Sequence, residues 1–248
     1  MQLRALDVAA TAINAGLYAA LGLIFYYILP ITAPGIGTVR FWPPVIVPAV
    51  FGALFGPWVG GIGAMTGIFI SDMFIHGNPI LSLMAGVTSN FVGFFLVGYL
   101  SRKTINWKMP MVAFGIISAL LIAITQMILV PTGLLSTVEG WLFSGIIAAT
   151  YVILLIVAYY STKWRGYEVG CMIGLLIGAA IIGAMVPVFS QLFIMPGETV
   201  LTPLFVSAGL WYLVWTFSTE IPFMIILGPP ILEACYKAFP SLKPSEKE

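Results

Sequence analysis

The chain has 248 residues, of which 60% are hydrophobic and only 8% charged, and its mean hydropathy is +1.08. A soluble domain carries about 25% charged residues, so ten basic and nine acidic side chains are too few to cover a soluble protein of this size. Nucleic acid is excluded as a partner as well, because its recognition needs a basic patch. The composition predicts an all-α, polytopic helical bundle in a lipid bilayer.

Long apolar runs divide the chain into predicted membrane spans. A helix needs about 20 apolar residues to cross a hydrocarbon core of about 30 Å. We predict eight spans, at 8–30, 43–56, 57–75, 79–100, 110–130, 141–161, 168–194 and 204–230. The second and third meet in a tight turn at Gly56-Pro57, and the alternative is one kinked span over 43–75 with a re-entrant piece.

The distribution of basic residues predicts the orientation in the membrane. With the N-terminus in the cytoplasm, only Arg40 among the ten basic residues lies outside, as the positive-inside rule favours. The other nine fall in cytoplasmic segments: Arg4, Arg102, Lys103, Lys108, Lys163, Arg165, Lys237, Lys243 and Lys247. Eight spans return the C-terminus to the cytoplasm. We therefore expect a multi-pass protein of the cell membrane with both termini cytoplasmic, and no disulfide between Cys171 and Cys235 in that reducing compartment.

Motifs for catalysis and metal binding are absent from the sequence. There is no phosphate-binding loop, no H-E-x-x-H and no G-x-S-x-G. His76 is the single histidine, which argues against a metal site. It follows Asp72 by four residues, and we interpret this pair as a hydrated helix cap rather than a catalytic dyad. We predict a protein that is not an enzyme and that needs no cofactor.

Two carboxylates fall inside predicted spans, where an ionised group costs several kcal/mol unless it is paired or hydrated. Asp72 lies at the outer end of the third span. Glu220 lies near the midplane of the last span if the aromatic residues 211, 212 and 215 form an outer belt at the membrane interface. Glu220 is either functional or hydrogen-bonded to backbone that Pro222 leaves free.

Uncharged polar residues make the outer half of the bundle more polar than the inner half. They are Asn90, Gln126 and Gln191. Each alone is typical of contacts between helices, but together they indicate a pocket that opens to the outside.

The segment from Thr32 to Pro44 strengthens this prediction. It combines two glycines with Arg40, Phe41 and Trp42. Arginine and aromatic side chains can cap a flat polar ligand by hydrogen bonding and stacking. The alternative is an anchor at the interface, with Trp42 among the headgroups and Arg40 reaching phosphate.

Small residues recur four positions apart on the first predicted helix. Ala5 and Ala9 form one such pair, and Ala15 and Ala19 form another. This spacing lets a second backbone approach closely. The partner is either another subunit or another helix of the same bundle.

The order of these features resembles the substrate-binding S component of energy-coupling factor (ECF) transporters. The stretch that carries the resemblance runs from Val39 to Ala64 and reads VRFWPPVIVPAVFGALFGPWVGGIGA, with Asp72 following near the end of the third helix. The Ala-x-x-x-Ala motif of the family is matched by Ala15 and Ala19, and a second copy by Ala5 and Ala9.

The resemblance implies a function, partners and a domain division. It implies uptake of a vitamin or related micronutrient, with a membrane T component contacting the alanines and two ATP-binding subunits supplying energy. It implies a six-helix domain at 1–165, two additional helices at 166–234 and a polar tail at 235–248.

By the same resemblance, the ligand lies between loop 32–44 and the outer ends of the fourth to sixth helices. The implied contacts are Arg40, Trp42, Asp72, Asn90, Gln126 and Trp141. The rival hypothesis is a secondary transporter without partner subunits, which relays an ion or proton through Asp72 and Glu220.

Overall fold

The computed structural model describes residues 4–31, 39–193 and 203–243. The predicted features of 32–38 in the Arg40 loop and of 244–248 in the tail lie outside these residues. Within the described chain every regular element is helical, and no strand is present. The predicted all-α class is confirmed.

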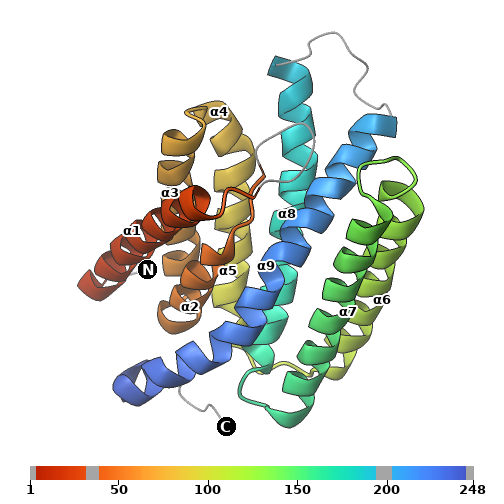
Figure 1. Cartoon of the computed structure of the whole chain (residues 1–248). Coiled ribbons are helices and arrows are strands. Elements are labelled where there is room, and N and C mark those ends of the chain that lie inside the picture. The colour runs from red at the N-terminus through yellow and green to blue at the C-terminus, as the bar shows by residue number, and fades with distance from the viewer. Residues whose placement is uncertain (1–3, 32–38, 194–202, 244–248) are drawn as a thin grey trace.

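Seven helices are long and apolar enough to cross a membrane, which makes the chain a multi-pass membrane protein. Four are single helices connected to the rest by loops (Figure 1): α1 (Ala5–Ile28), α3 (Pro57–Ile75), α7 (Thr137–Tyr160) and α8 (Arg165–Phe193). Two contain a π-helical turn: α4–η2–α5 (Pro79–Leu81, Ser82–Val87, Thr88–Leu100) and α6–η3 (Lys108–Ile124, Thr125–Leu129). The seventh, α9 (Pro203–Ala238), has 36 residues and continues past the predicted tail boundary at 235.

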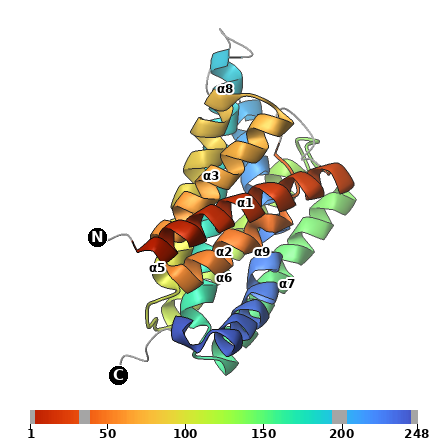
Figure 2. The ribbon, with the colours of Figure 1, turned by 90° about the vertical axis from the view of Figure 1, so that its left-hand side faces the viewer.

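The second predicted span is wrong as a full crossing. It consists of the 3₁₀ turn η1 (Pro43–Val45) and the ten-residue helix α2 (Ile46–Phe55). At 1.5 Å per residue they extend about 20 Å, less than the hydrocarbon thickness of about 30 Å. The predicted turn is confirmed, because Gly56 has a φ of +110° and α3 starts at Pro57. Figure 2 shows α1 crossing this short helix and α3 obliquely.

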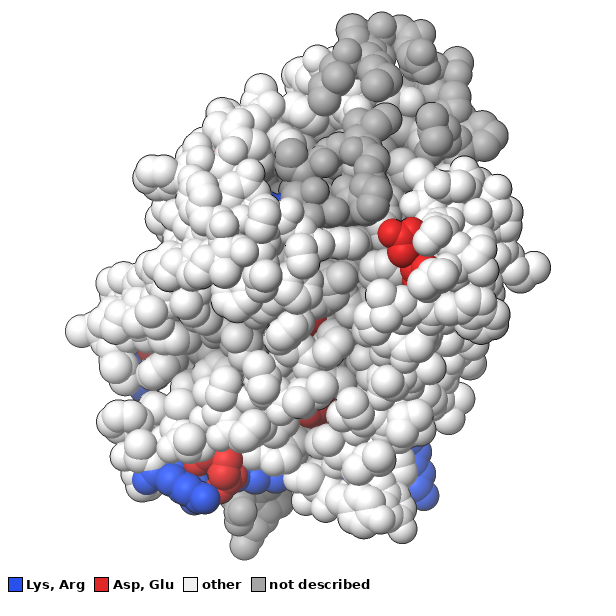
Figure 3. Space-filling view, viewed as in Figure 1, with Lys and Arg blue, Asp and Glu red and all other residues white. Residues whose placement is uncertain are grey.

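Most of the basic side chains collect at one end of the bundle. We call this end, where α5 ends, α6 begins, α7 ends and α8 begins, the basic end. Its side chains include Arg102, whose Nη2 donates to the Leu54 carbonyl at 2.9 Å, and Lys163, which pairs with Glu233. In Figure 3 most of the blue atoms lie along the lower part of the molecule, while red atoms are also visible on the surface at the upper right and recessed in the middle.

The helices do not pack as a six-helix core to which the last two helices are added. The helices α8 and α9 pack against each other, and α8 packs extensively along α5. Glycines make this possible, because a Cβ added to Gly174 would overlap the carbonyl oxygen of Gly93. By contrast, α6 packs mainly on α7, and this hairpin meets the bundle chiefly through α9, at the side of the molecule in Figure 1. The peripheral pair is therefore α6–α7.

The aromatic belt predicted on the last span is also wrong. Trp211 and Tyr212 are each 1% exposed, and Trp215 is 7% exposed. Trp211 packs edge-on against Phe143 of α7, with ring centroids 5.3 Å apart. These rings therefore form the contact between α9 and α7 inside the protein.

The alanines of α1 are divided between two faces, which corrects their assignment to one partner surface. Ala15 and Ala19 are buried within the chain, and the Ala15 carbonyl oxygen lies 2.8 Å from a Cβ added to Gly67 of α3. Ala5 and Ala9 are exposed. The exposed face continues through Ala12, Gly16 and Ala20.

Candidate ligand-binding site

A cavity of about 90 Å³ lies among α1, the segment before η1, α3, η2, α5, α8 and α9. The C-terminal end of α3 reaches this cavity. That end of the helix is opposite the basic end. Its polar lining is Tyr18, Arg40, Trp42, Asp72, His76, Asn90 and Glu220, and its apolar lining includes Val39, Ile68, Leu81, Ala85, Ile182 and Val186. A largely apolar wall with a few converging polar groups is typical of a small-molecule site.

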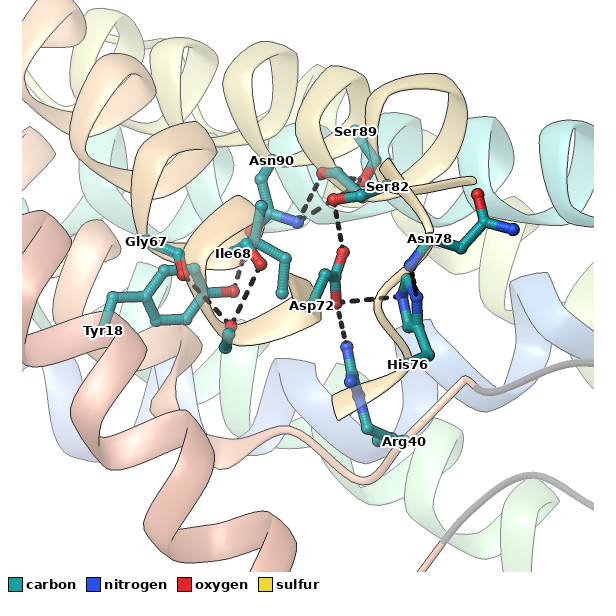
Figure 4. Close-up of polar contacts among 12 residues, drawn as sticks. Tyr18, Arg40, Gly67, Ile68, Asp72, His76, Asn78, Ser82, Ser89 and Asn90 are labelled. Carbon is teal, nitrogen blue, oxygen red and sulfur yellow. Dashed lines mark hydrogen bonds and ion pairs between the residues drawn. The ribbon is translucent and has the colours of Figure 1, made fainter. Parts of the chain in front are cut away.

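Asp72 is the centre of the polar network, as Figure 4 shows. Its Oδ1 pairs with Arg40 Nη2, and Ser82 Oγ donates to its Oδ2 at 2.6 Å. His76 Nε2 lies 3.5 Å from Oδ1, one turn along α3. The side chains of Arg40 and Asp72 are only 9% and 5% exposed, so this ion pair is buried. A buried carboxylate with several partners is held in one position.

The local fold explains how Ser82 reaches Asp72. The Asn78 side chain accepts from the Leu81 N–H at 3.0 Å and starts the helix after the turn. The π-helical turn η2 then brings Ser82 and Gly86 against α3. Gly86 is needed there, because an added Cβ would lie 2.7 Å from Asp72 Oδ2. Such π turns are frequent at functional sites.

Arg40 is fixed from three sides. Its guanidinium carbon lies 4.7 Å from the centroid of the Trp42 ring, and its carbonyl oxygen accepts from Trp215 Nε1 at 3.3 Å. The ion pair with Asp72 uses Nη2. The other nitrogen, Nη1, is buried and has no hydrogen-bond partner among the described residues. The guanidinium therefore retains a free donor at the cavity.

Trp42 fits into a notch on α1. A Cβ added to Gly22 would overlap its six-membered ring. The Trp42 ring also meets Tyr18 edge-on, with centroids 6.2 Å apart. Its Nε1 is buried without a partner within the described chain. Trp42 is 4% exposed, so the predicted interfacial anchor is wrong for this residue.

Asn90 joins α1 to α5 at the floor of the cavity. Tyr18 donates from its hydroxyl to Asn90 Oδ1 at 2.7 Å, and Asn90 Nδ2 donates to the Gly86 carbonyl at 2.9 Å. Both ends of the amide are therefore satisfied. This arrangement sets the direction of the Tyr18 ring, which Figure 4 shows beside the α3 turn.

Glu220 approaches the cavity from the middle of α9. It is 7% exposed, and it lines both this cavity and a smaller one between α5, α8 and α9. Its carboxylate makes no side-chain hydrogen bond or ion pair with the residues that the structure describes. The predicted hydrogen bond to backbone freed by Pro222 is therefore not formed.

The cavity collects four of the six predicted ligand contacts: Arg40, Trp42, Asp72 and Asn90. Gln126 and Trp141 lie on the peripheral hairpin instead. Gln126 Nε2 donates to Ser144 Oγ at 2.9 Å and joins η3 to α7. Trp141 is 67% exposed. Neither lines the cavity, because the hairpin packs on the other side of α9.

Sequence reasoning missed the contribution of α1, η2 and α8 to the cavity. The lining residues Tyr18, Ala85, Ile182 and Val186 carry no individual signal in an apolar helix. Glu220 gave a signal as a carboxylate inside a span, but the sequence did not place it beside Asp72. The two helices predicted to be additional, α8 and α9, in fact complete the cavity wall.

No family model, no curated protein and no solved structure matches the chain. The resemblance to S components therefore rests on the residues of this sequence. Among the described residues, no three His, Cys, Asp or Glu side chains are placed to hold a metal ion. What the arrangement offers chemically is a buried set of fixed donors and acceptors, which suits binding of a small polar molecule.

Proposed function

We propose that the protein is the substrate-binding membrane subunit of an ECF-type transporter for a vitamin or related micronutrient. The observation that carries this proposal is the cavity in which Arg40, Trp42, Asp72 and Asn90 converge. Their side chains are fixed by one another, which lowers the entropic cost of binding. In this account the chain is not an enzyme and has no cofactor.

The proposed direction of uptake is from the outside. The cavity lies away from the basic end, and basic residues favour the cytoplasmic side. Both the start of α1 and the end of α9 belong to the basic side in this proposal, so both termini are cytoplasmic. This requires an even number of passages, and the segment with the short helix α2 supplies the eighth, because it runs from Trp42 at the cavity to Leu54, whose carbonyl accepts from Arg102 at the basic end.

The proposed T component and two ATP-binding subunits supply the energy. The sequence lacks a phosphate-binding loop of its own. Support for a contact surface comes from α1, whose exposed small residues Ala5, Ala9 and Gly16 would let a partner helix approach closely. In the described part of the chain, no atom lies within 4 Å of a Cβ added to Gly16.

Two measurements on the protein test this function. A panel of vitamins and their precursors is screened for compounds that raise the melting temperature of the purified chain. A ligand at 100 times its Kd adds about 2.7 kcal/mol of stability. In parallel, the tagged chain is purified from its native membrane, and we expect a T component and a pair of ATP-binding subunits to accompany it. A chain that binds none of the compounds and purifies without an ATPase would contradict the proposal.

A second candidate function is a secondary transporter coupled to an ion or proton. The observation in its favour is Glu220, a carboxylate in a spanning helix with no ion-pair partner among the described side chains. In this case Glu220→Gln abolishes uptake but leaves ligand binding intact. Under the first proposal, uptake depends on ATP and on the partner subunits instead.

A further inference from the structure

We propose that the ligand of this cavity is a small organic cation, whose charged N–H group pairs with Glu220 while an acceptor on the same molecule meets Arg40. This inference rests on the proposed function only in taking the cavity as the ligand site. It adds the charge and the hydrogen-bonding pattern of the ligand, which the resemblance does not supply.

The charge of the cavity wall favours a cationic ligand. Two carboxylates, Asp72 and Glu220, face one guanidinium, that of Arg40. Arg40 is paired with Asp72. His76 also lies on the Asp72 side, with Nε2 3.5 Å from Asp72 Oδ1. Glu220 thus makes no ion pair within the described chain, and Arg40 acts on it only at longer range while it is paired with Asp72. A buried ionised carboxylate without a close counter-charge is disfavoured.

Beyond Arg40 and His76, the described residues place no basic side chain at the cavity. Apart from Arg40, the described basic residues flank helix ends at the basic end. The internal segments 32–38 and 194–202 contain no Lys, Arg or His in the sequence. Because Arg40 is already paired with Asp72, a close counter-charge for Glu220 would come from a bound molecule or from a proton. The experiment below separates these two sources.

Two residues of the cavity wall also carry hydrogen-bond donors that the described chain does not use. Arg40 Nη1 and Trp42 Nε1 are both buried without a hydrogen-bond partner within the described chain. Buried donors are normally paired, and leaving one unpaired costs about 1–3 kcal/mol. A ligand with a carbonyl or ring-nitrogen acceptor would satisfy them. The apolar side chains Ile68, Ile182 and Val186 then leave a space for the rest of a compact ring.

A series of three probes with one ring and three charges tests the inference. Benzamidine is a cation, benzamide is its neutral counterpart and benzoate is an anion of similar size. Binding to the purified chain is measured by tryptophan fluorescence and by the melting temperature at pH 8, where free imidazole is uncharged. We expect benzamidine to bind about tenfold or more tightly than benzamide, and benzoate to bind most weakly.

Glu220→Gln is the decisive variant, because it removes the charge and keeps the size of the side chain. We expect it to remove the preference of benzamidine over benzamide. Glu168→Gln is the matched control: Glu168 is also buried on a spanning helix without a hydrogen-bond partner in the described chain, but it does not line the cavity. This control should keep the preference of the wild type.

Three results would overturn the inference. They are a failure of benzamidine to bind the wild type, benzoate binding as tightly as benzamidine, and an unchanged benzamidine preference in Glu220→Gln. Equal binding of all three probes would indicate that a proton neutralises Glu220. If Glu220→Gln does not fold, the wild-type series still decides, and Glu220→Ala, which also removes the charge, replaces the variant. Failure of ATP-driven uptake would contradict the proposed function but leave this binding result intact.

Discussion

Arg40 and Asp72 are 32 positions apart in the sequence and form a buried ion pair in the cavity wall. The pair fixes the segment before η1 to the far end of α3. It also directs the guanidinium toward the Trp42 ring, 4.7 Å from its centroid. One contact thus connects the stability of this end of the bundle with the position of the groups that would meet a ligand.

We predict that Asp72→Asn destabilises the protein strongly. Removing one partner of a buried ion pair leaves the other charge uncompensated and costs about 3–5 kcal/mol. The same change weakens two further contacts, from Ser82 and His76. The measurement is the melting temperature in detergent.

A double variant isolates the contribution of the pair. Arg40→Gln/Asp72→Asn leaves no unpaired charge at this position. We expect its melting temperature to exceed that predicted by adding the two single effects, because the residues are coupled. Strict additivity would show that the ion pair contributes nothing.

Trp42→Ala is predicted to weaken ligand binding as well as stability. The side chain is 4% exposed and packs against Arg40, and truncating a buried Trp costs about 3–5 kcal/mol. Trp141→Ala is the matched control, because Trp141 is 67% exposed and lies on the peripheral hairpin. Ligand affinity should fall in the first variant and remain at the wild-type level in the second. Equal affinities in the two variants would remove Trp42 from the site.

Replacing a glycine by alanine should lower the stability where two helices are in contact and raise it where the helix face is open. Gly174→Ala places a methyl group against the Gly93 carbonyl, and overpacking of this kind costs about 1–3 kcal/mol. Gly145→Ala meets nothing within 4 Å on α7, so the higher helix propensity of alanine should stabilise it by up to about 1 kcal/mol. Thermal unfolding of the two variants measures this difference. A stabilising Gly174→Ala would contradict the α5–α8 packing.

The two alanine pairs of α1 are predicted to differ in the same way. Ala15→Trp inserts a large ring into the contact with α3 next to Tyr18, so both folding and ligand binding should fail. Ala9→Trp lies on the exposed face, so folding and binding should survive. We expect this second variant to lose uptake and to lose co-purification with partner subunits. Normal uptake by Ala9→Trp would show that this face is not the partner surface.

The apolar runs were sufficient to predict the class of fold and seven of the crossing helices, because burial in a bilayer imposes length and composition on each helix. They could not show that 43–55 is too short to cross, since a short apolar run in this stretch looks the same whether it reaches both interfaces or stays inside the protein. Gly56 and Pro57 did predict the turn, because a positive φ and a helix start have local causes.

The site was predicted only where a residue carries its own physical signal. Arg40, Asp72 and Glu220 stand out because charge in an apolar chain is costly, and Asn90 stands out by its depth in a span. Gln126 and Trp141 were predicted beside these residues but do not line the cavity, because sequence position does not show which helices pack together. Which helices pack together depends on glycine contacts such as that of Gly93 with Gly174. These residues are close in space but far apart in the sequence.

Substrate accumulation in proteoliposomes tests the central claim most directly. A radiolabelled compound selected by thermal stabilisation is offered to vesicles that contain the chain alone under a proton gradient. It is also offered to vesicles that contain the chain with its co-purified T component, its ATP-binding subunits and internal ATP. We predict accumulation only in the second case. Accumulation by the chain alone under the proton gradient would contradict the account and would establish a secondary transporter instead.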